Sequence, residues 1–327
     1  MGGLCYCIPA MTVVPGRTSI LIPSRNERYL PNTVRDLLAR SSGDVEIIVL
    51  LDGYWPDPLP PADPRVTLIH RPRATGMRDA INSAARLSRG QYLLKSDAHC
   101  LFGEGYDTIL KADCGDSDVV VPRRFSLDGD AWAPKPDKPA VDYHFLCWPA
   151  RNPAELGLHG EPWRERARAR TAPEYDLDED MSSQGSCWFM HRTHFTDHLN
   201  GLHEHGYEHF VQEFQEIGMK TWLGPWGGRC LTNKRTWYAH WHKGKSVGRG
   251  YHISTAEMVR GRLYSLDFWM NDLWPEHEHD MAWLVDRFWP VPTWPDDWQT
   301  TWARDGMGWI ESERTARADL LSQARPS

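Results

Sequence analysis

The sequence has no long apolar segment, no excess of positive charge and no cysteine framework. No apolar run within the 327 residues approaches the roughly 20 residues of a membrane-spanning helix. The first residues, MGGLCYCIPAMTVVPG, lack the basic start and long apolar stretch of a signal peptide. We therefore expect a cytoplasmic protein with no membrane partner. The formal net charge of −7 argues against a generally basic nucleic-acid binder. Seven scattered cysteines, an odd number, predict reduced thiols rather than disulfides.

Two common phosphate-binding fingerprints are also missing. Neither the G-x-G-x-x-G pattern of a dinucleotide-binding fold nor the P-loop occurs in the sequence. The composition is nevertheless that of a folded protein, with 41% hydrophobic and 25% charged residues. The length suits one large α/β domain of about 250 residues with a smaller appendage.

The N-terminal half alternates apolar strand patterns with amphipathic helix patterns. Strands are expected within residues 18–27, 45–53, 66–70 and 91–99, and helices over about 30–41 and 76–90. This alternation predicts right-handed crossovers and a doubly wound, mostly parallel sheet with flanking helices.

Three of these strands end in polar residues: Arg25 to Glu27 after the first, Asp52 on the second, and Asp97 with His99 after the last. Ligands of such sheets bind at the carboxyl ends of the strands. The sequence therefore predicts a site at this edge.

The rest of the chain divides into three parts. Residues 125–180 are rich in Pro, Arg and Asp and are expected to form an irregular excursion on the rim of the site. A further helix is predicted over about 207–220, and residues 254–327 form a Trp-rich, helical appendage. We expect an N-terminal extension over 1–17, a catalytic domain over 18–253 and the appendage.

The Asp97-x-His99 pair carries the strongest chemical signal. On a strand, residues two apart lie on one side of the backbone, so a carboxylate and an imidazole can coordinate one cation. This ligand pair favours Mn²⁺, with Mg²⁺ as the alternative, because Mg²⁺ prefers oxygen ligands. A cation there can stabilise the charge of a departing diphosphate.

In this order, the motifs resemble those of family-2-type glycosyltransferases of the GT-A fold, most closely the polypeptide N-acetylgalactosaminyltransferases. The matching segments are Asn26–Glu27, Glu46 to Asp52, Gly76 with Arg78, and Asp97–Ala98–His99–Cys100. Downstream, Gly185 to Phe195 resembles the segment that lines the donor sugar, and Glu213 to Ile217 with Trp222 resembles the family's E-N-L-E-I and Trp.

The resemblance implies a metal site and a catalytic carboxylate. His240 lies near the family's third metal ligand, with His242 as a competing choice. Glu213 and Glu216 are the catalytic candidates and lie on one face of a helix. We favour Glu213 for the chemistry; if the reaction inverts the configuration of the sugar, Glu213 would be the base that deprotonates the acceptor. Glu216 is then expected to be a solvated helix carboxylate.

The expected donor is a UDP-sugar. Asp52 is expected at the nucleotide, with a helix N-cap as its alternative, and Arg78 at the base or a phosphate, with a surface position as its alternative. Lys243 and Arg249 belong to a Gly-containing loop that we expect to close over the pyrophosphate. The predicted donor-binding residues are Pro23, Arg25, Glu27, Asp52, Arg78, Ser96, Gly185, Ser186, Lys243 and Arg249.

Two features depart from the family. Phe210 to Gln212 replaces its W-G-G, and Leu51 replaces one of its paired aspartates. The sugar and the acceptor are therefore not carried over by the resemblance.

The preferred acceptor is a hydroxymethylated pyrimidine in DNA, by similarity to compact transferases of bacteriophages, which implies the host cytoplasm. The basic run Arg164, Arg166, Arg168 and Arg170 would then contact DNA, or else form a solvated loop. The alternatives are a protein, glycan or small-molecule hydroxyl. A nucleotidyltransferase and a non-catalytic carbohydrate- or nucleic-acid-binding protein are the competing classes; the oligomeric state stays open.

Overall fold

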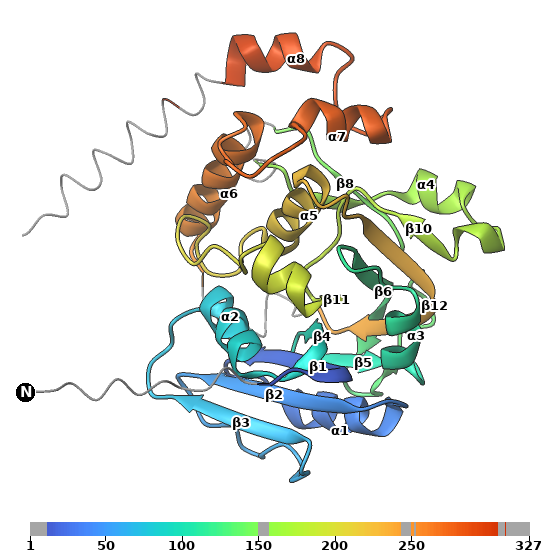
Figure 1. The fold of residues 1–327 in the computed structure, drawn as a ribbon, viewed down its shortest axis with the longest axis vertical. Coiled ribbons are helices and arrows are strands. Elements are labelled where there is room, and N and C mark those ends of the chain that lie inside the picture. Colours follow the sequence, from blue (N-terminus) through green and yellow to red (C-terminus); the bar gives the residue numbers. More distant parts are fainter. Residues whose placement is uncertain (1–11, 150–156, 243–249, 252, 307–310, 312–327) are drawn as a thin grey trace, which may run out of the picture.

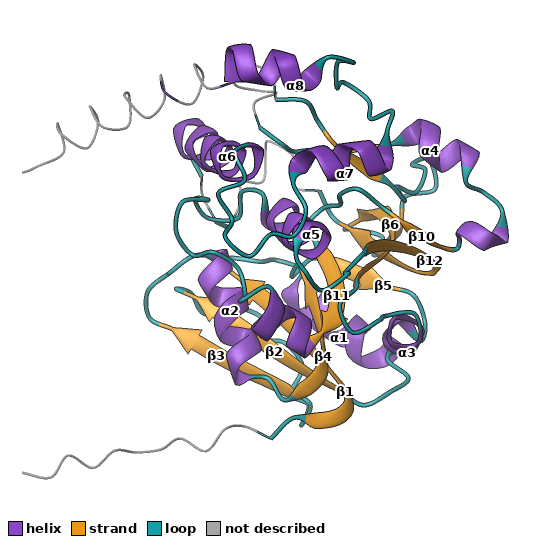
Figure 2. Ribbon diagram, turned by 45° about the horizontal axis from the view of Figure 1, so that its top comes forward, coloured by secondary structure: helices purple, strands orange, loops and turns teal. Residues whose placement is uncertain are grey.

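The structure, a computed structural model, describes residues 12–149, 157–242, 250–251, 253–306 and 311. Its centre is a ten-stranded mixed sheet in the order β10-β12-β6-β11-β4-β1-β2-β3, with β5 paired to β12 and β7 to β6. Figures 1 and 2 show helices on both faces of this sheet. The strands of the sheet are β1 (Val14–Ser24), β2 (Val45–Asp52), β3 (Val66–Arg71), β4 (Gly90–Ser96), β5 (Cys100–Phe102), β6 (Val119–Asp128), β7 (Ala133–Pro134), β10 (Leu177–Glu179), β11 (Cys187–His191) and β12 (Cys230–His240).

The N-terminal half is a parallel, doubly wound sheet, as predicted. Strands β3, β2, β1 and β4 pair in parallel. Most residues of β1, β2 and β4 are buried, whereas the edge strand β3 is only partly buried. Helices α1 (Leu30–Arg40) and α2 (Met77–Leu87) lie on opposite faces of these strands (Figure 1), because right-handed crossovers in opposite directions place their helices on opposite faces.

The second half of the sheet is mixed. Strand β11 is antiparallel to both β4 and β6, whereas β6 and β12 are parallel. Helices α3 (Tyr106–Ala112) and α5 (Glu213–Leu223) belong to this half, and α5 begins later than the predicted helix. Strand β5, which directly follows the turn after β4, pairs antiparallel with the end of β12, so that Cys100 lies opposite His240.

The described parts of the stretch 125–180, residues 125–149 and 157–180, are more ordered than predicted. They hold the end of β6, a second small sheet formed by β8 (His144–Leu146) and β9 (Gly160–Pro162), the helix α4 (Arg164–Ala169), and β10. His144 and Trp163 are buried, which explains why a Pro- and Arg-rich sequence is nevertheless packed.

Up to residue 306, the C-terminal region is largely helical and its tryptophans are mostly core residues. Helix α6 (Thr255–Met270) begins with a capping box formed by Ser254 and Glu257, and α7 (Met281–Phe288) and α8 (Trp298–Thr301) follow. Among the described residues, no helix is long and apolar enough to cross a membrane. The buried tryptophans of this region, Trp269, Trp274, Trp294, Trp298 and Trp302, join the same hydrophobic cluster as the sheet.

Candidate active site

A cavity of about 480 Å³ opens where several strands of the sheet end. Pro23 and Glu27 reach it from the end of β1, and Asp97 and His99 from the turn after β4. His240 reaches it as the last residue of β12. Because β1 and β4 run parallel, the polar residues that follow them lie at the same edge of the sheet, as the sequence predicted.

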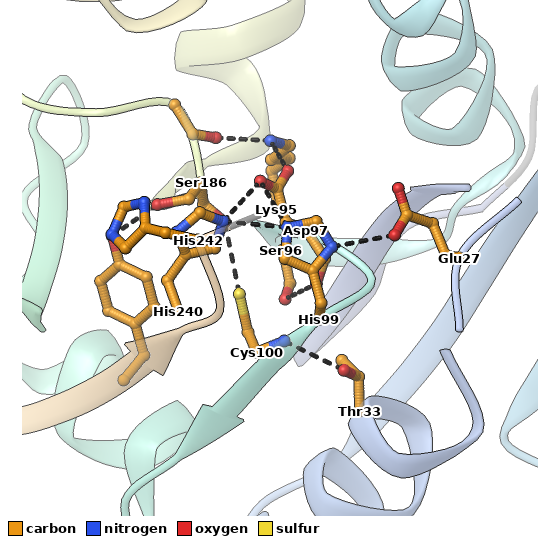
Figure 3. A network of polar contacts seen from close by, with 12 residues as sticks. Glu27, Thr33, Lys95, Ser96, Asp97, His99, Cys100, Ser186, His240 and His242 are labelled. Atoms are coloured by element: carbon orange, nitrogen blue, oxygen red, sulfur yellow. Dashed lines mark hydrogen bonds and ion pairs between the residues drawn. The ribbon is translucent and has the colours of Figure 1, made fainter. Parts of the chain in front are cut away.

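Asp97, His99 and His240 converge on one point, as Figure 3 shows. Nε2 of His240 lies 3.0 Å from Nε2 of His99 and 3.2 Å from Oδ2 of Asp97, and the third separation, His99 Nε2 to Asp97 Oδ2, is 3.8 Å. Ligands about 2.1 Å from one cation lie at separations of this size.

The hydrogen bond of Glu27 settles which nitrogen of His99 faces the centre. Oε2 of Glu27 lies 3.1 Å from Nδ1 of His99, and a carboxylate oxygen accepts, so Nδ1 carries the proton and Nε2 presents its lone pair. Two ring nitrogens and a carboxylate oxygen then lie between 3.0 and 3.8 Å from one another. A histidine ligand oriented by a carboxylate is typical of metal sites, so these residues fit a divalent cation.

His242 lines the same cavity but does not join the three donors. Its Nε2 accepts a hydrogen bond of 2.9 Å from Nη1 of Arg124, and its ring meets that of His240 edge-on. Burial and Arg124 lower the pKa of His242 to about 4. The geometry thus favours His240 over His242 as the third ligand.

Lys95, which the sequence analysis did not single out, lies beside the carboxylate of Asp97. Its Nζ is fully buried and lies 2.6 Å from Oδ1 of Asp97 and 3.3 Å from Oε2 of Glu213, and it also donates to the carbonyl of Gly185. Burial by itself lowers the pKa of Lys95, but Asp97 and Glu213 outweigh it and raise that pKa. A lone lysine two residues before Asp97 in an apolar strand was the available signal, since both side chains share one face.

Lys95 in turn determines the state of Asp97. Burial raises the pKa of Asp97, but Lys95 and the hydrogen bond with His240 outweigh burial and hold it well below its usual range. With Oδ1 bonded to Lys95, Oδ2 is the oxygen that faces the two imidazoles.

Glu213 lines the cavity from the first turn of α5. Its Oε1 accepts a hydrogen bond of 2.8 Å from the indole nitrogen of Trp188. Burial raises the pKa of Glu213, and Lys95 opposes that shift. A Cβ atom at Gly185 would lie 3.0 Å from the carboxyl carbon of Glu213, which is closer than an ordinary van der Waals contact. The absence of a side chain at Gly185 therefore leaves room for the carboxyl group of Glu213 beside the cavity.

Glu216 is neither in the cavity nor solvated, which corrects the expectation of a solvated helix residue. It is fully buried and pairs with Arg78 and, at 2.8 Å, with Lys220. Arg78 is likewise buried rather than at the surface, and its guanidinium also donates to the carbonyl of Val211. Both side chains point into the core because α2 and α5 pack there, so the structure does not bring Arg78 or Glu216 to the site.

The predicted nucleotide-binding residues divide into two groups. Asp52 is buried and accepts hydrogen bonds from the backbone nitrogens of Thr75 and Gly76, both 3.0 Å long, so it holds the turn before α2. Arg25 donates to the carbonyl of Asp52, and Ser96 donates to the carbonyl of Asp97. By contrast, Pro23, Glu27, Gly185 and Ser186 line the cavity, while Lys243 and Arg249 lie outside the described residues.

The basic run forms the helix α4 rather than a loop, with Arg170 as its C-cap. Three of its four arginines, Arg166, Arg168 and Arg170, have a carboxylate within 4.0 Å. The guanidinium of Arg166 packs over Tyr143, Trp163 and Phe288. Arg170 makes two hydrogen bonds of 2.9 Å with Asp178. The helix α4 lies beside β10, the edge strand (Figure 1).

A sheet with a carboxylate and two imidazoles at its strand ends, beside a cavity, fits the GT-A fold. Residues 19–199 match the family model described as "Glycosyl transferase family 2". The match spans more than half of the chain, so this protein belongs to glycosyl transferase family 2. No curated protein sequence matches the chain.

Solved structures share the fold at low sequence identity. The crystal structure of GalNAc-T7 with UDP, GalNAc and Mn²⁺ is 16% identical with a TM-score of 0.59, covering 78% of this chain and 49% of that one. This chain thus spans about half the length of that relative. Staphylococcus aureus TarS in complex with UDP-GlcNAc is 11% identical with a TM-score of 0.49, over 82% of this chain and 69% of that one.

Proposed function

We propose that this protein transfers a sugar from a UDP-sugar to an acceptor hydroxyl, with Mn²⁺ held by Asp97, His99 and His240. The observation that carries the proposal is the convergence of these three donors within 4.8 Å of one another at the wall of the cavity. The structure of GalNAc-T7 with UDP, GalNAc and Mn²⁺ supports the same donor and cation. When bound, the cation supplies Lewis-acid stabilisation of the diphosphate leaving group.

The chain's own residues prepare this site. Glu27 orients His99, and Lys95 orients Asp97 so that one carboxylate oxygen faces the imidazoles. Preorganised groups of this kind stabilise charge without reorganising during the reaction.

Glu213 is the carboxylate that we place beside the reacting sugar. It lines the cavity and is held by Trp188 and Lys95. If the reaction inverts the anomeric configuration, Glu213 takes the proton of the acceptor hydroxyl; if it retains it, Glu213 contacts the donor sugar.

Nucleotide release tests this function. The protein is incubated with Mn²⁺ and a panel of UDP-sugars, and free UDP is measured with and without EDTA. Release that depends on the cation and on one sugar is expected, whereas a binding protein releases no UDP. GDP-mannose is the donor control, since a mannosyltransferase from Pyrobaculum calidifontis has been solved with GDP-Man and Mn²⁺ (17% identity, TM-score 0.43, 73% of this chain and 60% of that one).

For the acceptor, we propose hydroxymethylated pyrimidine in DNA as the first to test, against peptide, glycan and small-molecule hydroxyls. Arg164 and Arg168 are the exposed cations of α4, whereas Arg166 and Arg170 pack against the protein. If α4 binds duplex DNA, reversing Arg164 and Arg168 to Glu should weaken binding and flatten its salt dependence. Mass spectrometry of the products identifies the acceptor independently of α4.

A further inference from the structure

Two consecutive arginines on β6, Arg123 and Arg124, have opposite surroundings. Arg123 makes two hydrogen bonds with Asp142, of 2.7 and 2.8 Å, and its charge is paired. Arg124 is 7% exposed, and no carboxylate of the described residues forms an ion pair with it. Successive strand residues face opposite sides of a sheet, so the two guanidinium groups lie on different faces.

Arg124 uses little of its hydrogen-bonding capacity. Its guanidinium carries five N–H groups, and its one side-chain partner within the described chain is Nε2 of His242, at 2.9 Å. Its Nε is buried without a partner. Since an arginine can only donate, His242 accepts with a lone pair of a neutral ring and does not compensate the charge.

The second neighbour of this arginine is equally unable to neutralise it. His144 is buried, and neither of its ring nitrogens has a hydrogen-bond partner. Burial and the charge of Arg124 lower the pKa of His144 to about 3, so its ring is also neutral. A buried cation without a counter-charge is strongly unfavourable, and a buried polar group without a partner in a folded protein calls for an explanation.

This uncompensated charge lies next to the active site. In the parallel pairing of β6 with β12, Arg124 is opposite Tyr238 and Ser126 is opposite His240, so Arg124 faces the same side of the sheet as His240. Its partner His242 lines the cavity and stacks edge-on against His240, with ring centroids 4.6 Å apart.

We propose that Arg124, together with His242, forms an anion subsite that binds a phosphate group of the substrate beside the metal triad. Phosphate oxygens accept bidentate hydrogen bonds from a guanidinium and supply the missing negative charge. The inference rests on the proposed function, which provides two sources of that chemistry: the diphosphate of the donor and a phosphate carried by the acceptor.

The experiment compares Arg124→Met with Arg123→Met, a matched control on the same strand. Binding of UDP and of inorganic pyrophosphate, each with Mn²⁺, is measured by calorimetry, and KM is measured for a hydroxymethylated oligonucleotide and for the free nucleoside. If the donor is the source, Arg124→Met should raise the Kd of UDP and of pyrophosphate at least about tenfold. If the acceptor is the source, these Kd values stay constant and KM rises at least about tenfold for the oligonucleotide alone. Arg123→Met should leave all four values unchanged.

Thermal unfolding without ligand provides a second readout. Loss of an unpaired buried charge should leave the melting temperature of Arg124→Met unchanged or raised, whereas Arg123→Met loses a paired one and should melt earlier. Should Arg124→Met fail to fold, Arg124→Lys keeps the charge without the bidentate geometry and should show a smaller loss of the same affinity.

The subsite would be overturned if Arg124→Met kept the wild-type Kd values for UDP and pyrophosphate and the wild-type KM for the oligonucleotide. If Arg124→Met does not fold, the same result in Arg124→Lys would overturn it. The proposed function would stand in that case, provided that sugar transfer continued. Conversely, if no UDP-sugar is consumed but pyrophosphate binding still depends on Arg124, the subsite stands and the proposed function fails.

Discussion

Helix α5 contributes one glutamate to each of two buried charge clusters. Both clusters pair a glutamate with a lysine, but one borders the cavity and the other lies in the core. One turn apart on this helix, Glu213 pairs with Lys95 and Glu216 pairs with Lys220 and Arg78. Both lysines are buried and both donate to backbone carbonyls as well. The first cluster, Lys95–Asp97–Glu213, lines the cavity; the second, Arg78–Glu216–Lys220, is enclosed by the core.

The difference teaches that burial and ion pairing do not by themselves indicate function. Burial raises the pKa of Glu213, whereas Lys220 and Arg78 outweigh burial and lower the pKa of Glu216. The cavity cluster has one cationic side chain, Lys95, and two carboxylates. The core cluster has two cationic side chains, Arg78 and Lys220, and one carboxylate. A surplus of negative charge beside a cavity suits a divalent cation, while a self-contained cluster suits a structural role.

The largest effect is expected from removing one of the three proposed metal ligands, of which Asp97 belongs to the cavity cluster and His99 and His240 face it. Asp97→Ala, His99→Ala or His240→Ala should lower the rate of sugar transfer more than about a hundredfold, because the charge of the leaving group loses its stabilisation. Circular dichroism should show an intact fold. Activity that survives EDTA, or a near-normal rate in these variants, would contradict the metal assignment.

The two glutamates give the next contrast. Glu213→Gln should lower kcat by about a hundredfold or more, with a modest change in stability. Glu216→Gln should instead reduce the free energy of unfolding by about 3–5 kcal/mol, because two buried cations lose their carboxylate. Chemical denaturation and kinetics at a temperature where both variants are folded separate the two effects, and the reverse ranking would assign the chemistry to Glu216.

The two lysines sharpen the same comparison by a smaller margin. Lys95→Met and Lys220→Met each leave a buried carboxylate with fewer partners, so both should lower the melting temperature. Only Lys95→Met should also reduce kcat, by about tenfold or more, because Asp97 and Glu213 lose their common anchor. Equal kcat values in the two folded variants would show that Lys95 is purely structural.

The smallest effect concerns the histidine outside the triad. In the absence of nucleotide, His242→Ala should change the affinity for Mn²⁺ by less than about tenfold, which is below the usual effect of removing a residue that contacts a metal ligand. His240→Ala should weaken the same affinity far more. Calorimetric titration of Mn²⁺ decides between them. A larger loss in His242→Ala would move the third ligand to that residue.

Much of the fold and the centre of the site were predictable from the sequence. The strand and helix patterns of residues 18–99 placed β1 to β4 close to their observed bounds, because a parallel sheet buried on both faces needs continuous apolar strands. The Asp-x-His spacing put two ligands on one side of the backbone.

The surroundings of Arg78, Glu216, Lys95 and Arg124 were decided only by the tertiary structure. From the sequence alone, a charged residue on a helix is expected to face solvent. Only the packing of α2 against α5 shows that Arg78 and Glu216 are buried and form an ion pair with each other. Lys95 and Glu213 are 118 positions apart, and Arg124 and His242 also 118. Local periodicity determines which face a side chain occupies, but the partner on that face comes from distant chain segments, so charge compensation is a property of the assembled fold.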